Sequence, residues 1–127
     1  MDINELTLVL PGSIRSKKNS KIATVIGGKN KPRRAILLPS KAYTAWEKGA
    51  RRAAWKHAIL PPLTCPVWIE AHIYYKGQQP DLSGSCESIG DCLEGIIYAD
   101  DSQIYSWDGS RLHHDVEDPR TVVTIRW

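Results

Sequence analysis

The sequence has no long run of apolar residues. Its first apolar segment covers residues 6–10 and is followed at once by Pro11 and Gly12. A membrane-spanning helix needs about 20 apolar residues, and the apolar core of a signal peptide is about 7 to 15 residues long. We therefore expect a cytoplasmic protein with no membrane partner.

Cysteine is also scarce. The three cysteines, Cys65, Cys86 and Cys92, are odd in number, and no CxxC motif or Cys/His ligand spacing surrounds them. A disulfide framework and a cysteine-based zinc site both require such patterns. The cysteines are therefore predicted to be free thiols.

Acidic residues are nearly missing from the first half of the chain. Residues 1–60 contain 13 Lys and Arg but only 3 Asp and Glu, whereas residues 61–127 contain 4 and 11, a contrast that the formal charge of +3 conceals. A basic surface attracts a polyanion, and an acidic cluster in the same protein is tolerated when cations bind there. This combination is the first indication of a metal-dependent nuclease.

The most basic segment covers residues 15–34 and contains no acidic residue. Short strands are predicted at 22–26 and 35–38, on either side of a turn-rich stretch at 27–32. We interpret the segment as a basic hairpin or mobile loop that contacts DNA, although a solubilising arm also fits its composition. The candidate DNA-binding residues are Arg15, Lys17, Lys18, Asn19, Lys21, Lys29, Lys31, Arg33 and Arg34.

The remaining pattern predicts a single α/β (α+β) domain over residues 1–127, because a chain of this length can bury one core. Strands are expected at 3–10, 67–75, 103–107 and 121–127, and helices at about 40–60 and 83–93. Asp108 and Gly109 predict a hairpin turn before the last strand. We expect a small mixed sheet with two helices packed against it.

Acidic residues recur in three short motifs of the second half. The motifs are Pro80–Ser83 (PDLS), Asp91–Gly95 (DCLEG) and Asp100–Gln103 (DDSQ). Asp81 alone fits the N-cap of a helix, and Asp100 and Asp101 alone fit a turn, because short acidic side chains bond to nearby backbone N–H groups. The three motifs in this order call for a further explanation.

In that order they resemble the RusA family of Holliday-junction resolvases, as a divergent member of the kind found in phages or prophages. Members share a Pro-Asp-Leu-Asp/Ser opening, a helix that ends in Asp-x-Leu-x-Gly, and an Asp-Asp-x-Gln at the start of the next strand. The resemblance extends to residues 17–20 and to residues 40–43 with Trp46. It therefore covers most of the chain and implies a RusA-like fold.

The resemblance implies that Asp81, Ser83 and Asp101 bind Mg²⁺ beside the scissile phosphate, with Mn²⁺ as an alternative, and that Asp100 assists them. Mg²⁺ is a hard cation that takes oxygen ligands and keeps several waters, one of which can attack the phosphate. A helix lying back over a sheet would bring Asp81 and Asp101 together. We expect these carboxylates to form the catalytic site.

Three residues depart from the family pattern. Well-known members have a second Asp at the position of Ser83, an Asn at that of Gly84 and a Lys at that of Glu87. Glu87 follows Ser83 by one helical turn on the same face. Our hypothesis is that Glu87 replaces the missing carboxylate as a catalytic metal ligand, and that Lys76 or the basic segment replaces the missing Lys.

Other polar residues of this half receive no firm role in the chemistry. Asp91 and Glu94 match the solvated face of a helix, and we interpret Glu94 in that way. His113 and His114 are adjacent, so in a strand their side chains would point to opposite faces. We predict that the two histidines lie in a surface hairpin.

The sequence thus predicts a magnesium-dependent endodeoxyribonuclease that resolves Holliday junctions in DNA recombination and repair. Two symmetric cuts in branched DNA suggest a homodimer, because a twofold axis supplies two identical sites. Two alternatives stay open. One is a junction-binding module with weakened catalysis, and the other is a protein-interaction domain with an acidic patch.

Overall fold

A five-stranded mixed sheet forms the body of the protein in the computed structural model, which describes residues 3–16 and 21–127. Its strands are β1 (Glu5–Pro11), β4 (Val67–Tyr75), β5 (Ile104–Ser106), β6 (Arg111–His114) and β7 (Arg120–Arg126). Strand β7 pairs antiparallel with both β1 and β4, and β5 and β6 run parallel to β4. Strands β4 and β7 alternate between buried residues and partly or fully exposed ones, so one face of the sheet is buried.

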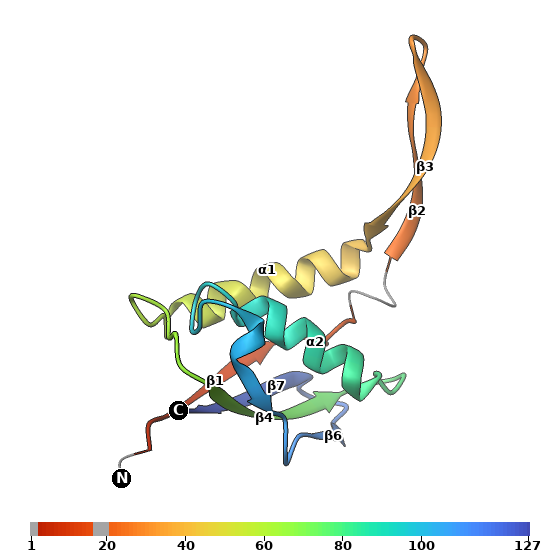
Figure 1. Ribbon diagram of the computed structural model, residues 1–127. Helices are drawn as coiled ribbons and strands as arrows, with labels where there is room; N and C mark the ends of the chain where they lie inside the picture. The colour runs from red at the N-terminus through yellow and green to blue at the C-terminus, as the bar shows by residue number, and fades with distance from the viewer. Residues whose placement is uncertain (1–2, 17–20) are drawn as a thin grey trace.

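Two helices, α1 (Lys41–Trp55) and α2 (Leu82–Leu93), cover that face (Figure 1). Helix α1 buries Tyr43, Trp46, Ala50 and Ala54 at three- and four-residue spacing, which is the period of one helix face. The Ser40 hydroxyl accepts a hydrogen bond from the Tyr43 backbone N–H at 3.1 Å and caps the helix. The α+β class, the mixed sheet and the two helices are as the sequence predicts.

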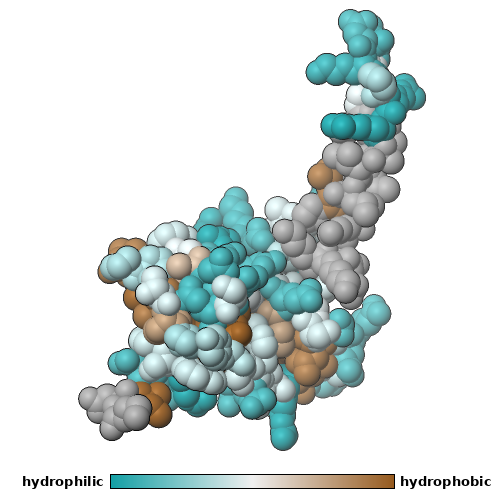
Figure 2. All heavy atoms as spheres, in the orientation of Figure 1, coloured by the Kyte–Doolittle hydropathy of each residue, from teal (hydrophilic) through white to brown (hydrophobic). Residues whose placement is uncertain are grey.

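The remaining strands, β2 (Lys21–Gly28) and β3 (Lys31–Pro39), form an antiparallel ribbon that projects away from the body (Figure 1). The end of the ribbon carries the exposed residues 29–34, and Figure 2 shows hydrophilic side chains gathered there. The predicted basic hairpin is therefore present.

Two local predictions are wrong. Helix α1 ends at Trp55 and not near residue 60, because the chain turns at Lys56 and the Ile59 backbone N–H donates to the carbonyl of Ile96 at 3.0 Å. The turn at Asp108 and Gly109 does not join paired strands, because β5 and β6 both pair with β4. The two strands form one interrupted edge of the sheet.

The cysteines are free, as predicted. Burial raises the pKa of Cys86 to about 11 and that of Cys92 to about 12, so both thiols are poor nucleophiles at neutral pH.

Within the described residues, no helix is both long and apolar enough to cross a membrane.

Candidate functional site

Three carboxylates meet where helix α2 ends. Asp91 lies in the last turn of α2, Glu94 follows as its C-cap, and Asp101 begins the short 3₁₀ helix η1 (Asp101–Gln103). Carboxylate oxygens of the three residues lie within 4.8 Å of one another. We call these residues the acidic cluster. Neither Asp91 nor Glu94 was among the site residues that the sequence predicted, although their spacing of three places both on one side of a helix end.

The carboxylates of the acidic cluster repel one another, because they carry charge of the same sign. Loss of hydration raises the pKa of Asp101, and the negative charge of Glu94 and a hydrogen bond with Asp100 raise it further. The pKa of Asp100 is lowered instead, first by the backbone N–H of Ser102, which donates to Asp100 Oδ1 at 2.9 Å. A cation at the cluster would relieve the repulsion around Asp101.

Hydrogen bonds explain why the Asp-Asp-x-Gln motif adopts this turn. The Gln103 side chain accepts from the Asp100 backbone N–H at 2.7 Å and donates to the carbonyls of Leu63 and Cys65 at 2.7 and 2.9 Å. The Asp101 backbone N–H donates to Glu94 Oε1 at 3.1 Å. The glutamine thus anchors the turn to the body, and Glu94 fixes Asp101 beside the end of α2.

Arg51 of helix α1 contacts the backbone that carries the acidic cluster. Its guanidinium donates to the carbonyl of Cys92 at 2.9 Å and lies 3.5 Å from the carbonyl oxygens of Asp91 and Glu94. These carbonyls belong to the end of α2, where backbone acceptors lack helical partners and a cation is favourable. Arg51 therefore caps the helix that carries two of the three acids.

Replacing Arg51 with Met should lower the free energy of unfolding by about 1.5–3 kcal/mol, because a charged donor to several carbonyls is lost. Urea denaturation measures this loss. Arg52→Met is the matched control, since Arg52 is exposed on the same helix. Equal stability losses in the two variants would mean that the cap contributes nothing specific.

A groove of about 870 Å³ connects the acidic cluster with the exposed side of α2. Its polar lining includes Ser83, Glu87, Asp91 and Asp101. Ser83, Glu87 and Asp91 recur every four residues along α2, so they share one face of the helix. Of the five residues that the sequence singled out as catalytic or metal-binding, three therefore line this groove: Ser83, Glu87 and Asp101.

Asp81 lies elsewhere. It is the N-cap of α2, and its Oδ2 accepts from the Gly84 backbone N–H at 3.1 Å and from the Ser83 hydroxyl at 3.3 Å. Asp81 lines a second cavity, of about 440 Å³, together with Arg15 and Lys76. The N-cap role is confirmed.

Within one chain, Asp81 and Asp101 are not brought together. Helix α2 has twelve residues, which corresponds to about 18 Å, and Asp81 precedes its first residue while Asp101 bonds to Glu94 at its other end. The expectation of convergence was wrong because residues 94–101 fold against the C-terminal end of α2 and do not return along it. Asp81 and Asp101 face solvent at opposite ends of the helix.

The basic candidates divide between two places. Lys29, Lys31, Arg33 and Arg34 are exposed at the end of the ribbon, and Arg15 is exposed beside the Asp81 cavity. Lys21 begins β2. Lys17, Lys18 and Asn19 lie outside the described residues. The ribbon thus carries a concentrated positive charge at its end.

Residues 11–126 match the model of the family described as endodeoxyribonuclease RusA. No curated protein matches the chain. The match includes the ribbon, both helices and all three acidic motifs.

Proposed function

Because the chain belongs to the RusA family of endodeoxyribonucleases, we propose that it hydrolyses phosphodiesters at four-way DNA junctions with the help of Mg²⁺, for which Mn²⁺ can substitute. The observation that carries this proposal is the acidic cluster of Asp91, Glu94 and Asp101 beside a groove. The basic ribbon provides a separate surface for the DNA backbone. Recombination and repair are the processes that produce such junctions.

The acidic cluster fits a magnesium ion in ligand type and spacing. Oxygen ligands lie about 2.1 Å from Mg²⁺, so two oxygens on one ion are at most about 4.2 Å apart. The cluster's oxygens are within 4.8 Å of one another, and small side-chain rotations close the difference. When bound, the ion would activate water and neutralise charge on the phosphate. Asp91, Glu94 and Asp101 would hold it, and Arg51 and Gln103 keep their backbone in place.

Asp81 can serve the same chemistry only from another subunit, because α2 separates it from Asp101 of its own chain. We therefore propose a homodimer in which Asp81 of one subunit completes the acidic cluster of the other. A resolvase also needs two identical sites, which a twofold dimer supplies.

Mixing the Asp81→Asn and Asp101→Asn proteins tests this arrangement. A mixed dimer with shared sites has one intact pair of carboxylates, so nicking of the junction should return after subunit exchange. Sites built within single chains would leave both halves of the mixed dimer inactive. Gel assays of each variant alone give the baseline.

Glu87 is proposed as the replacement for the carboxylate that Ser83 lacks. Both residues line the groove that contains Asp101. Glu87→Gln should lower the apparent affinity for Mg²⁺ in the cleavage reaction by about 10- to 100-fold, as expected for a group that binds or orients at a metal site. Glu117→Gln, on the exposed β6–β7 connection, is the control. Unchanged metal-dependent cleavage in Glu87→Gln would refute the role.

The function is tested by comparing cleavage of a labelled four-way junction with cleavage of linear duplex of the same sequence, in Mg²⁺ and in EDTA. Preferential, metal-dependent nicking of the junction is the expected result. Tight binding without nicking would indicate the weakened binding module that Ser83 and Glu87 also suggest. Weak binding that is unchanged in the Asp101→Asn protein would indicate the protein-interaction domain.

A further inference from the structure

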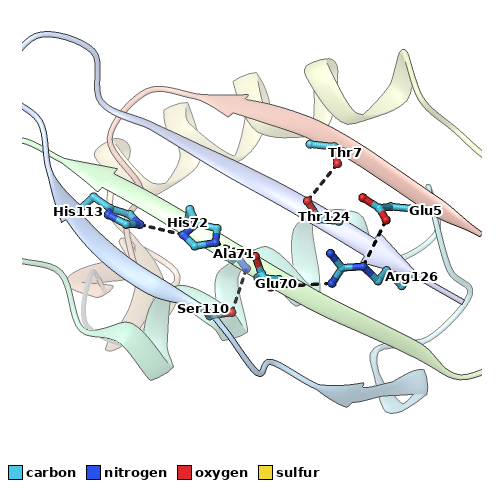
Figure 3. A network of polar contacts seen from close by, with 9 residues as sticks. All are labelled: Glu5, Thr7, Glu70, Ala71, His72, Ser110, His113, Thr124 and Arg126. Atoms are coloured by element: carbon cyan, nitrogen blue, oxygen red, sulfur yellow. Dashed lines mark hydrogen bonds and ion pairs between the residues drawn. The ribbon is translucent and has the colours of Figure 1, made fainter.

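The face of the sheet that the helices leave open carries a chain of polar contacts across β1, β7, β4 and β6 (Figure 3). Glu70 and His72 lie two residues apart on β4 and so point to the same face. His113 lies on β6, opposite Tyr74 in the parallel register. The prediction that His113 and His114 lie in a surface hairpin is therefore wrong, because both belong to β6, which pairs with β4 and not with a neighbouring strand of a hairpin.

The two histidines are in direct contact through their ring nitrogens. His72 Nδ1 lies 2.8 Å from His113 Nε2, and His72 Nε2 lies 2.8 Å from Glu70 Oε2. An ionised carboxylate only accepts hydrogen bonds, so the proton of neutral His72 is on Nε2. His72 Nδ1 consequently presents a lone pair toward His113.

Neighbouring side chains contact both rings. The His113 ring stacks on Tyr74 with centroids 4.6 Å apart and an angle of 17° between the planes. The Arg120 guanidinium lies 4.0 Å from the Tyr74 ring centre, and Glu70 is 3.9 Å from Arg126. The histidines are thus oriented by contacts on either side, and both are only partly buried, so that water can reach them.

We propose that His72 Nδ1 and His113 Nε2 bind a transition-metal ion of the Zn²⁺ class, with Glu70 as the carboxylate that orients His72. A carboxylate bonded to the second nitrogen of a histidine ligand is the usual arrangement at such sites. Two nitrogens on a tetrahedral Zn²⁺ are about 3.4 Å apart, so the rings must separate by about 0.6 Å from their present contact. The His113 proton moves to Nδ1 through solvent, and water completes the coordination.

This site is independent of the acidic cluster in place and in chemistry. It lies on the open face of the sheet, whereas the cluster lies at the end of α2. Imidazole nitrogens suit Zn²⁺, Ni²⁺ and Cu²⁺, and carboxylates suit Mg²⁺. A bound ion would tie edge strand β6 to β4 and stabilise that edge of the sheet.

Calorimetric titration of Zn²⁺ into the protein in excess Mg²⁺ tests the proposal. We expect one ion per chain, binding reduced by about 10- to 100-fold in Glu70→Gln, and a larger loss in His113→Gln. His114→Gln, which alters the adjacent exposed histidine of β6, is the matched control and should bind as the unaltered protein does. Asp101→Asn should also retain Zn²⁺ binding, so this test stands even if the proposed nuclease activity fails.

A second measurement avoids the possibility that a variant misfolds. In the unaltered protein, imidazole ¹⁵N resonances of His72 and His113 should shift with Zn²⁺ while those of His57 and His114 remain in place. Zn²⁺ binding of equal strength in His113→Gln, or resonance shifts at His57 or His114 alone, would overturn the proposal.

Discussion

Asp101→Asn is expected to reduce junction cleavage by at least about 100-fold, because it removes a charged ligand from the acidic cluster. The same change should stabilise the metal-free protein at neutral pH. Folding raises the pKa of Asp101, so the ionised carboxylate disfavours the folded state above both the unfolded and the folded pKa. Asparagine removes this repulsion and can still donate a hydrogen bond to Asp100.

The stabilisation should be about 0.5 kcal/mol, since the group is exposed and screened by solvent. It should disappear as the pH falls through the raised pKa and below the unfolded value, where Asp101 itself is protonated. Thermal melts in EDTA across this pH range measure the effect. Asp108→Asn is a control for the loss of one exposed negative charge. A less stable Asp101→Asn protein, or one that still cleaves, would contradict the role of the cluster.

Removing the charges at the end of the ribbon should weaken junction binding roughly 100- to 1,000-fold at low salt. The variant replaces the exposed Lys29, Lys31, Arg33 and Arg34 with Ala. Each lost phosphate contact lowers the slope of log affinity against log salt concentration by about 0.9. A drop of about three to four in that slope is therefore expected, measured by fluorescence anisotropy in EDTA so that the DNA stays intact.

A second set of four basic residues provides the control. Lys41, Lys48, Arg52 and Lys56 are exposed on or beside helix α1, away from the end of the ribbon that carries residues 29–34. Their replacement with Ala makes the same change in net charge. Equal weakening in both variants would show that net charge alone drives binding and that the ribbon has no special part in it.

Local structure followed from the sequence where the pattern is set by neighbours along the chain. The alternation of β4 predicted Val67–Tyr75 as the structure has it. Ser40 and Asp81 were identified as helix caps, because their side chains bond to backbone groups three residues away. The basic ribbon followed from two short strands around a glycine-rich turn.

Strand partners were harder to predict, because hydrophobic periodicity does not say which strand lies alongside. Asp108 and Gly109 do form a turn, and Gly109 has the positive φ of 88° that such turns favour. This turn connects β5 to β6, and both strands lie along the same edge of β4. Similarly, helix α1 ends early because of a long-range bond to Ile96, which local spacing cannot reveal.

The candidate site was predicted in part. The Asp-Asp-x-Gln motif gave Asp101, and the groove contains Glu87 as well. The sequence did not give Arg51, Asp91 or Glu94 as site residues, since their roles depend on what meets at the end of α2. It also could not give the separation of Asp81 from Asp101, because residue spacing does not say whether a chain returns along a helix.

The central claim is tested most directly by mapping the nicks in a four-way junction whose strands are labelled one at a time. The account predicts two Mg²⁺-dependent nicks on opposing strands, at positions symmetric about the branch point, and no comparable nicks in linear duplex. Nicks at equal rates in duplex, or an intact junction that remains tightly bound in both Mg²⁺ and Mn²⁺, would contradict it.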